Sequence, residues 1–372
     1  MKHILFVLVA VALTSCATPT TMSPQGSSAE IDKEASLQKK LALKRSLEED
    51  ARVRNIAFPI SKANASLCED THYELGMTVW NHESISREYQ DVAHEVYGVG
   101  SDLQVRNVYK NTPASANGIK AGDIIFAIDE QEIPAGRNAM KTMATILDKA
   151  DQQIAMTIVR NGKEIDKTIT RAETCGYGVI YDSENSSVNA YADGNNIIIP
   201  RGMLRFVDSD KELALVIAHE LGHNAMGHMD KKRTNAMGAG LGGFALDILA
   251  AAAGVNTGGA FTDAAARAGA GAYSVEFEQE ADYVGMYFLA RAGYSTSGVA
   301  NFWRRMSSEL NDSNINERST HPATAERFVA IEKAHAEIQA KKSSGKKLVP
   351  EIDLEKQERS NMKYEEPQGY NN

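Results

Sequence analysis

The chain has 372 residues, of which 43% are hydrophobic and 24% are charged. This composition excludes a largely disordered chain and provides enough apolar material for two domains with cores of their own. The 40 basic and 49 acidic residues give a net charge of -9 that is spread along the chain, so we expect no nucleic-acid partner.

A targeting signal occupies residues 1–15. It contains an apolar run from Ile4 to Leu13, which is too short to span a bilayer. The Leu-Thr-Ser-Cys sequence that ends at Cys16 resembles the lipobox of bacterial lipoproteins, which implies cleavage before Cys16 and lipidation of that residue. An ordinary cleaved signal peptide is the alternative. Because Ala17 follows the cysteine, the resemblance implies a lipid anchor in the outer membrane of a Gram-negative cell, facing the periplasm; the inner membrane is the other option.

Two further cysteines, Cys68 and Cys175, are left for other roles. In an oxidising periplasm two such thiols form a disulfide, and two separate buried thiols are the alternative. A Cys68–Cys175 bond would bring together the ends of the segment between them. That segment would then be an insertion into a domain that begins before it and resumes after it.

Residues 16–29 are rich in Thr, Ser, Pro and Gly and predict a flexible tether. From Glu30 to Arg54, Leu37, Leu41 and Leu47 recur near helical spacing. This pattern predicts an amphipathic helix that packs on the domain beyond the insertion. We therefore assign residues 30–84 to the first part of that domain.

The segment between the cysteines alternates strand-like runs with turns. Strands are expected at 102–108, 124–128 and 154–159, with a helix near 137–149. A Pro-Ala pair at Pro113, followed by Gly-Ile at Gly118 and Gly-Asp at Gly122, resembles the signature of PDZ domains, here over residues 85–172.

A PDZ domain implies the binding of peptide ends, added as a strand beside a helix, with the carboxylate in a glycine-containing loop. We expect this loop at Tyr97, Gly98, Val99 and Gly100. A spacer without peptide binding is the alternative.

Residues 173–340 carry the catalytic pattern. Strands are expected at 188–191 and 197–199, around a hairpin-like turn, and a helix start follows at Ser209. The apolar helix then presents His219, Glu220 and His223. The two histidines are one turn apart and can bind one zinc ion, whereas Glu220 lies beside them and can accept a proton from the attacking water.

A third ligand is needed for a catalytic zinc site. His228 is five residues beyond His223 and points elsewhere on a straight helix, so we interpret it as structural. A second helical pattern places Glu278, Asp282 and Gly285 on one face. Glu278 can bind the metal, and Asp282 can accept a hydrogen bond from a ligand histidine. By composition, Glu276 and Glu280 are rivals for the ligand.

The His219-Glu220-x-x-His223 motif with Glu278-x-x-x-Asp282 resembles the gluzincin peptidases of the HtpX, BepA, LoiP and CAAX-prenyl-endopeptidase group. The resemblance implies an α+β protein: a mostly helical zincin-type metallopeptidase domain with a small edge sheet, plus the inserted, β-rich PDZ domain. It also implies one Zn²⁺ per chain, with Glu278 as third ligand. The sequence departs from the group at Val275, where arginine is frequent.

Two more features follow from the same resemblance. Asn189 and Ala190 would lie on the edge strand that aligns substrate. His321, in a Thr-His-Pro sequence, would face the metal and act as a gate or stabilise the oxyanion. A histidine in an exposed loop is the alternative reading of His321.

Two segments carry no catalytic motif. Residues 236–272 are rich in Gly and Ala and predict a mobile helical lid over the cleft, with contact to the bilayer as the alternative. Residues 341–372 are polar, show no periodicity and predict a disordered tail.

The expected function is hydrolysis of peptide bonds by a zinc-dependent endopeptidase. Its substrates would be misfolded, stalled or misassembled envelope proteins, captured by the PDZ domain, while the lipid anchor holds the enzyme at the membrane. The alternative is a chaperone-like assembly factor of the periplasm with latent proteolysis.

Overall fold

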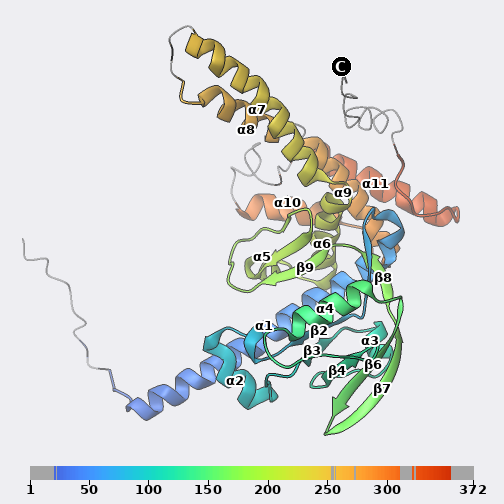
Figure 1. Ribbon diagram of the computed structural model, residues 1–372. Coiled ribbons are helices and arrows are strands. Elements are labelled where there is room, and N and C mark those ends of the chain that lie inside the picture. Colours follow the sequence, from blue (N-terminus) through green and yellow to red (C-terminus); the bar gives the residue numbers. More distant parts are fainter. Residues whose placement is uncertain are drawn as a thin grey trace, which may run out of the picture.

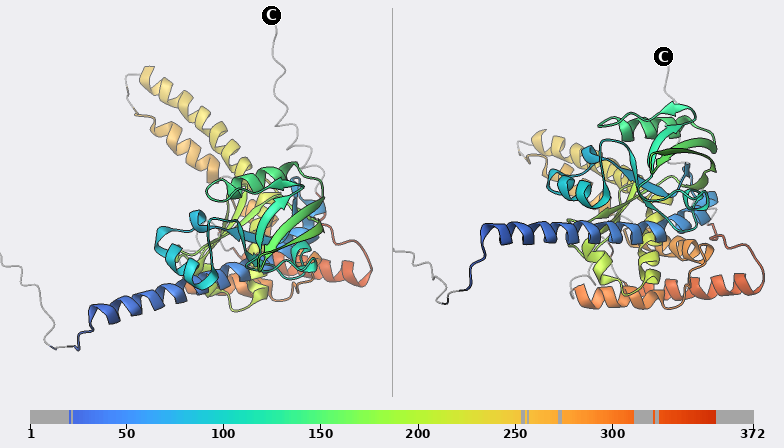
Figure 2. Two further views of the ribbon diagram at one scale, coloured as in Figure 1. Left: turned by 60° about the horizontal axis from the view of Figure 1, so that its bottom comes forward. Right: turned by 90° about the horizontal axis from the view of Figure 1, so that it is seen from below.

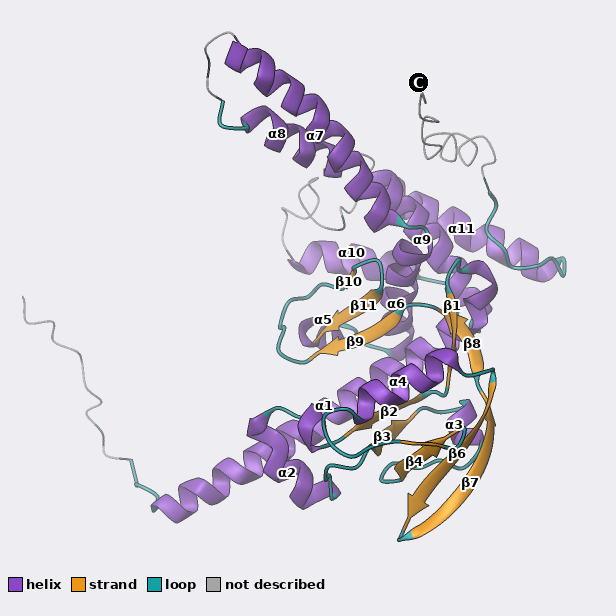
Figure 3. Cartoon of the chain, viewed as in Figure 1, coloured by secondary structure: helices purple, strands orange, loops and turns teal. Residues whose placement is uncertain are grey.

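A computed structural model gives the fold and describes residues 21, 23–252, 255, 257–271, 274–310, 321 and 324–352. Helices and strands both contribute (Figure 3), which confirms the expected α+β class. Figure 1 shows two parts on either side of a long helix, a β-rich part below and a mostly helical part above. The signal segment 1–15 and Cys16 lie outside the described residues.

The long helix is α1 (Ser28–Asn64), and it begins within the segment expected to be a tether. The Ser27 hydroxyl accepts a hydrogen bond from the N–H of Glu30, and the Glu30 carboxylate accepts one from the N–H of Ser27. This reciprocal cap satisfies two N–H groups that a helix start would otherwise leave unpaired. The helix thus starts slightly earlier than the predicted position.

Helix α1 packs on the protein from about Lys40 onward. Leu37 and Leu41 are exposed, so the expectation that they face the domain is wrong. The buried apolar positions near the helix end belong to the core of the helical part: Val53, Ile56, Ala57 and Ile60. The start of α1 therefore projects beyond the body (Figure 2).

A narrow neck joins the β-rich part to the rest of the chain. Strand β1 (Thr71–Glu74) leads into it and β8 (Ala172–Cys175) leads out, and the two pair antiparallel. The predicted disulfide, Cys68–Cys175, is present beside this pair. The ends of the insertion therefore lie together, as the insertion hypothesis requires.

The β-rich part is an antiparallel sheet in the order β2-β3-β4-β6-β7, with β5 added to β4. Its strands are β2 (Met77–Trp80), β3 (Gln104–Val108), β4 (Ile124–Ile128), β5 (Gln131–Glu132), β6 (Gln153–Arg160) and β7 (Lys163–Thr170). Its helices are α2 (Arg87–Tyr97), α3 (Pro113–Ala116) and α4 (Ala139–Lys149). The three strand-like runs and the long helical stretch were expected.

The expected start of this part at residue 85 is too late. Met77 of β2 pairs with Val108 of β3, so β2 already belongs to the sheet. The strand was missed because it is only four residues long and because α2 separates it from its partner.

The helical part surrounds a small sheet in the order β10-β11-β9. The strands are β9 (Gly178–Asp182), β10 (Tyr191–Ala192) and β11 (Asn196–Pro200). The helices are α5 (Arg201–Phe206), α6 (Asp210–Ala225), α9 (Ser274–Arg291), α10 (Val299–Leu310) and α11 (Ala325–Ser343). Their apolar faces and the end of α1 share one core.

Two helices between α6 and α9 form a projecting hairpin. They are α7 (His228–Ala252) and α8 (Ala260–Gly271), and they pack against each other. The hairpin extends away from the body rather than across α6 (Figures 1 and 2), so the predicted lid is wrong.

The C-terminal segment is ordered further than expected. Helix α11 continues to Ser343, and the chain then folds back, with the Lys341 ammonium donating to the carbonyl of Val349 at 2.7 Å. Arg291 donates to the carbonyl of Leu348 at 3.2 Å. These side chains satisfy backbone acceptors in a segment without apolar periodicity, so the prediction of disorder is wrong for residues 341–352. The rest of the tail lies outside the described residues.

Candidate active site

Helices α6 and α9 cross at close range because each has a glycine at the contact. A Cβ atom on Gly222 would lie 3.0 Å from the carbonyl oxygen of Ala281, and one on Gly285 would lie 3.1 Å from that of Ala218. Larger side chains would hold the two backbones apart. The crossing brings together three metal-ligand candidates: His219 and His223 from α6 and Glu278 from α9.

The three candidates present their donor atoms to one point. Nε2 of His219 lies 3.2 Å from Nε2 of His223 and 3.3 Å from Oε2 of Glu278. Nε2 of His223 lies 3.2 Å from Oε1 of Glu278. In a tetrahedral centre with ligand bonds of about 2.0–2.1 Å, donor atoms are roughly 3.3 Å apart. The spacing therefore fits a metal ion between these three groups.

The outer nitrogen of each histidine ring contacts another buried group. Nδ1 of His219 lies 3.0 Å from Oδ1 of Asp282. Nδ1 of His223 lies 2.9 Å from Nδ1 of His228, whose Nε2 lies 2.8 Å from a carboxylate oxygen of Glu280. If Glu280 accepts the His228 proton, His228 in turn accepts the Nδ1 proton of His223. Both ligand rings then turn a lone pair on Nε2 toward the common point.

The buried polar atoms of the site also indicate that a cation binds there. Within the described residues, Oε1 of Glu278 and Oε2 of Glu220 are buried without a hydrogen-bond partner. Two Nε2 lone pairs at 3.2 Å repel each other unless a proton or a metal ion lies between them. Unpaired buried acceptors are costly, so the donor set fits a resident metal ion.

The surrounding protein groups shift the pKa values of the two histidines in opposite directions. Burial opposes the charged form of His219, but Asp282 and Glu278 outweigh burial and raise its pKa to about 10. Burial lowers the pKa of His223 to about 3. His219 would have to lose a proton to bind a metal ion here, so metal affinity would fall as the pH falls.

Arg327 of α11 contacts the carboxylates of both Asp282 and Glu278. Its guanidinium donates to both carboxylate oxygens of Asp282, at 2.8 and 3.0 Å, and lies 3.3 Å from Oε2 of Glu278. The indole of Trp303 packs against the His219 ring, with ring centroids 4.9 Å apart. All of these side chains are buried or nearly so, which fixes the ligands in one arrangement.

Glu220 lies beside the three donors without joining them. It is 2% exposed, and burial raises the pKa of its carboxyl group above the usual range. A buried carboxylate with a raised pKa takes up a proton more readily than a solvated one. The structure thus places a proton acceptor next to the candidate metal point.

His321 completes the group from a different segment. Its Nδ1 lies 2.9 Å from Oε2 of Glu278 and 3.4 Å from Nε2 of His219. The donor atoms of His219, His223, Glu278 and His321 all lie within 4.8 Å of one another. Nε2 of His321 lies 3.1 Å from the carbonyl oxygen of Ala190. His321 is therefore close enough to the shared point to be a fourth donor.

The edge strand lies next to this point but is shorter than expected. Asn189 and Ala190 precede β10 rather than belonging to it, because regular pairing with β11 starts only at Tyr191. Asn224, directly after His223, connects the catalytic helix to the β10–β11 turn: its amide donates to the carbonyl of Asn196 at 3.0 Å. Its side-chain oxygen accepts from the N–H of Gly194 at 2.9 Å.

The PDZ loop predicted at residues 97–100 is not a binding loop in the structure. Gly98 ends α2 in a left-handed conformation, the ring of Tyr97 packs against Trp80, and Val99 is buried. A helix C-cap and a strained binding loop share the same glycine pattern, which explains the error.

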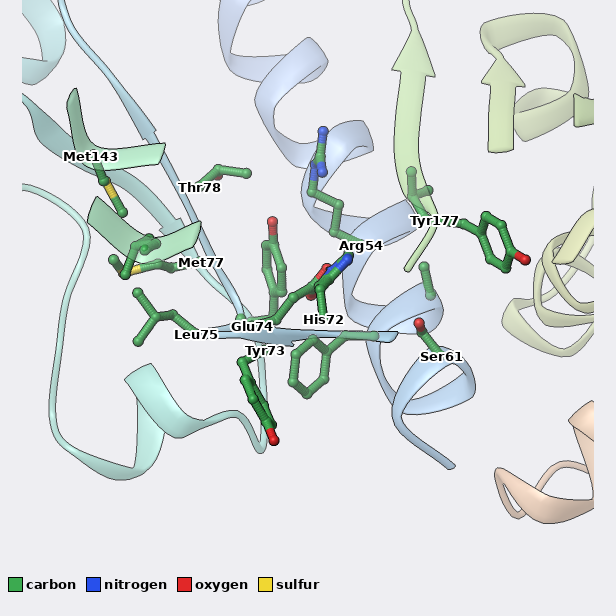
Figure 4. Close-up of a pocket in the computed structure, with 16 residues that line it drawn as sticks. Arg54, Ser61, His72, Tyr73, Glu74, Leu75, Met77, Thr78, Met143 and Tyr177 are labelled. Carbon is green, nitrogen blue, oxygen red and sulfur yellow. The ribbon is translucent and has the colours of Figure 1, made fainter. Parts of the chain in front are cut away.

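A cavity of about 300 Å³ lies instead between the edge strand β2, helix α4 and helix α1 (Figure 4). Met77 of β2 and Met143 of α4 line one side, and Arg54 of α1 lines another. A glycine turn at Gly76, with φ of +75°, leads into β2 at the cavity. The strand–helix groove expected of a PDZ domain is therefore at β2 and α4.

Sequence patterns indicated the ligands but not all of their supports. His228 and Glu280 act together on His223, although the first was interpreted as structural and the second was only a rival ligand. Their spacing of 52 residues contains no signal of contact. Arg327 had no predicted role. A buried arginine near Glu278 and Asp282 becomes recognisable once α9 and α11 are known to pack.

The chain matches models of peptidase family M48 over residues 155–335 and of the PDZ domain over residues 74–170. It is 28% identical over 137 residues to the beta-barrel assembly-enhancing protease of Yersinia pestis, covering 35% of this chain and 28% of that protein. It is 29% identical over 196 residues to metalloprotease LoiP of Escherichia coli K12, covering 49% and 76%.

Among solved structures, the HtrA-type protease AlgW with a decapeptide matches at 25% identity and a TM-score of 0.22, over 28% of this chain and 30% of that chain. The chain spans 28% of the length of the Yersinia relative. The PDZ match covers β2 to β7, and the peptidase match contains the whole candidate metal point. Residues 155–335 are therefore similar to peptidases of family M48, the chain is similar to beta-barrel assembly-enhancing proteases and to LoiP, and residues 74–170 are similar to a PDZ domain.

Proposed function

We propose that the chain is a zinc-dependent endopeptidase that cleaves misfolded, stalled or misassembled proteins of the cell envelope. The observation that carries the proposal is the cluster of the two histidine Nε2 atoms and the carboxylate oxygens of Glu278, 3.2–3.3 Å apart, beside the buried carboxylate of Glu220. Two histidines and one carboxylate are a donor set typical of catalytic zinc. The names of the relatives support proteolysis in this setting.

The three ligands would hold the zinc ion, which when bound supplies a Lewis acid for the scissile carbonyl and makes water more acidic. Glu220 accepts the proton of the attacking water and delivers it to the leaving amine. Because the pKa of Glu220 is raised, its carboxyl group readily keeps the proton that it has accepted from water. The carboxylate of Asp282 and the ring of His228 keep the ligand histidines in the orientation that this chemistry requires.

Substrate would align by its backbone along the exposed side of β10. In the order β10-β11-β9, β10 is an edge strand, so one side of it has no partner strand in the described sheet. An extended polypeptide can pair there with little dependence on its side chains. The Asn224 contacts hold this edge at a fixed place relative to the catalytic helix.

His321 would act as a gate at the same place. Its ring occupies the space beside the three ligands and contacts the carbonyl of Ala190 at the entry to β10. Substrate that pairs with this edge would compete with His321 for Ala190. Displacement of the ring by substrate would then open the position needed for water.

The PDZ part would capture exposed peptide ends in the cavity between β2 and α4. A lipid at Cys16 would hold the chain at the outer membrane with the enzyme in the periplasm. The sequence around Cys16 supports this anchor.

A comparison of the mature chain with its Glu220→Gln variant tests the proposal. We expect about one zinc per chain in both proteins, measured by atomic emission, and casein cleavage only by the parent. The variant keeps the size and the ligands of the site, so lost cleavage is attributable to the missing base. Absence of zinc in the parent would refute the metal assignment. Full function of the variant in cells would instead identify a chaperone-like assembly factor.

A further inference from the structure

The α7–α8 hairpin carries an apolar surface that the catalytic site does not use. Helix α7 passes the length and composition criteria for a membrane-crossing helix, with a mean hydropathy of 1.3, and only 11% of its apolar window is buried. A helix in the core of a soluble domain would be mostly covered. Large apolar side chains of α7 are exposed: Met237, Leu241, Phe244, Leu246, Ile248 and Leu249.

Charges on the hairpin are distributed unevenly. Lys231, Lys232 and Arg233 lie at the base of α7 beside one acidic residue, Asp230, which pairs with Arg233 at 3.1 Å, and the chain from there to Asp263 contains a single charged residue, Asp247. The exposed charges of the distal half, Asp263 and Arg267, both lie on α8. The hairpin therefore has an apolar helix with basic residues at its base, packed on one side against a second helix that carries the distal charges.

Asp247 does not interrupt the apolar surface, because α8 satisfies its carboxylate. The N–H groups of Phe261 and Thr262 donate to it at 3.2 and 2.8 Å, and the hydroxyls of Thr257 and Thr262 donate as well. The side chain is only 9% exposed. It binds α7 to α8 and presents no unpaired charge to the surroundings.

The hairpin also extends toward the side from which the chain would be anchored. In Figure 1 the free end of the hairpin and the start of α1 both lie to the left of the body, the hairpin at the top and α1 at the bottom. The segment before α1 leads to Cys16, where the lipid is expected. The expected tether between Cys16 and α1 would allow the lipid and the hairpin to reach the same bilayer.

We propose that the α7–α8 hairpin binds the surface of a phospholipid bilayer, with α7 immersed in the interface and α8 on its aqueous side. The exposed side chains of α7 would enter the boundary between headgroups and acyl chains, to a depth of about 5–10 Å. Lys231, Lys232 and Arg233 would contact anionic headgroups. The occupant is a bilayer rather than a protein groove because Leu246 and Leu249 extend the apolar surface of α7 well beyond the stripe formed by the other exposed apolar side chains, so the surface is wider than the seam of a helix in a groove.

The apolar surface does not depend on the proposed peptidase activity. It lies, however, on a hairpin that is joined directly to the helices of the active site. Helix α7 begins at His228, which contacts His223, and α8 leads into α9, which carries Glu278. The hairpin is thus inserted between the two helices that supply the metal ligands. Binding of the hairpin to a bilayer would hold the metal point next to the membrane.

Vesicle binding of the full mature chain with Cys16→Ser, which has no lipid of its own, tests the proposal. Vesicles of phosphatidylethanolamine and phosphatidylglycerol should sediment with this protein, and replacement of the phosphatidylglycerol by phosphatidylcholine should weaken binding. Leu241 and Leu249 are 71% and 65% exposed, so Leu241→Ser/Leu249→Ser should weaken partitioning by about tenfold or more. Val329→Ser, at a 55% exposed site on α11, is the matched control and should bind like the parent.

Two tryptophan probes test the orientation. Phe244→Trp on α7 should shift its emission to the blue with vesicles and be quenched by brominated lipid, whereas Ala264→Trp on α8 should show neither effect. Unchanged circular dichroism establishes that each variant is folded. No vesicle binding by the parent, or equal binding by the double serine variant, overturns the proposal. Quenching of both probes overturns the stated orientation, and a parent that self-associates through this face without lipid identifies a second copy as the occupant.

Discussion

Nδ1 of His228 lies 2.9 Å from Nδ1 of His223, and the opposite nitrogen of His228 lies 2.8 Å from Glu280. A ring outside the metal point thereby determines which nitrogen of His223 can bind the metal. His228 is the first residue of α7 and is fully buried. The helix that projects from the body is therefore tied at its base to a ligand of the catalytic site.

Replacement of His228 should weaken metal binding without removing any ligand. In His228→Leu, Nδ1 of His223 loses its acceptor, so the tautomer with a free Nε2 is no longer favoured. We expect zinc affinity to fall by about 10–100-fold, as for other partners of ligand histidines. Competition with a chromogenic chelator measures this affinity. Glu280→Gln, which keeps the ring, should show a smaller loss. Equal affinity in all three proteins would show that the contact has no effect on the ligand.

Removal of His321 should open the site. Because its Nδ1 lies among the donor atoms and its Nε2 contacts Ala190, His321→Ala frees both the fourth position and the edge of β10. We expect unchanged zinc content and faster casein cleavage. The absorption of the cobalt-substituted protein should also change, because a histidine donor is exchanged for water. Slower cleavage with an unchanged cobalt spectrum would contradict a gate and favour a role for His321 in stabilising the oxyanion.

The ligands were predictable from sequence because their signal is local. His219 and His223 share one helix face, and Glu278 and Asp282 share another, so helical periodicity alone places each pair. What joins the two pairs is not local. The contact of α6 with α9 depends on Gly222 and Gly285, and Arg327 approaches from a third helix. Such tertiary contacts leave little trace in a single sequence.

Substitution of Gly285 should separate the two ligand helices. In Gly285→Ala the new methyl group would lie 3.1 Å from a carbonyl oxygen of α6, so α9 has to shift. We expect a loss of about 1–3 kcal/mol in the free energy of unfolding. Weaker zinc binding should follow, because Glu278 moves with α9. Urea denaturation and chelator competition measure the two effects.

Gly242→Ala is the matched control for this prediction. Gly242 lies on helix α7, and a methyl group there would meet no other atom within 4 Å. The change should be neutral, or stabilising by about 0.5–1 kcal/mol, because alanine favours helix more than glycine does. If both variants behaved alike, the close crossing of α6 and α9 would not be what determines the stability of the site.

Peptide capture should depend on the cavity between β2 and α4 rather than on residues 97–100. Met143 lines this cavity, so Met143→Glu should weaken the binding of unstructured peptides about tenfold or more by replacing an apolar contact with a charged side chain. Val96→Glu adds the same charge at an exposed position next to the 97–100 loop and should bind peptides like the parent. Fluorescence anisotropy with a labelled peptide library provides the comparison. A loss confined to Val96→Glu would restore the original assignment.

Short elements and caps account for most of the errors at the level of the fold. Strand β2 escaped prediction because α2 intervenes before its partner, and Gly98 was misread because a helix cap and a binding loop use the same residue type. Leu37 and Leu41 have helical spacing but are exposed, since the start of α1 projects beyond the body. Periodicity indicates that a helix forms, but it does not indicate what the helix packs against.

The Cys68–Cys175 bond closes a loop with a sequence separation of 107 residues, so it should contribute strongly to stability. In the chain-entropy account, a loop of this length corresponds to about 4–5 kcal/mol, and native disulfides typically contribute about 2–5 kcal/mol. The double variant Cys68→Ala/Cys175→Ala should lose an amount in this range on urea denaturation. Because Cys175 is fully buried, part of that loss could arise from packing rather than from the cross-link. The reduced parent separates the two causes, since it keeps both side chains and lacks only the bond. A reduced parent as stable as the oxidised one would show that the antiparallel pairing of β1 with β8 is sufficient to hold the neck together.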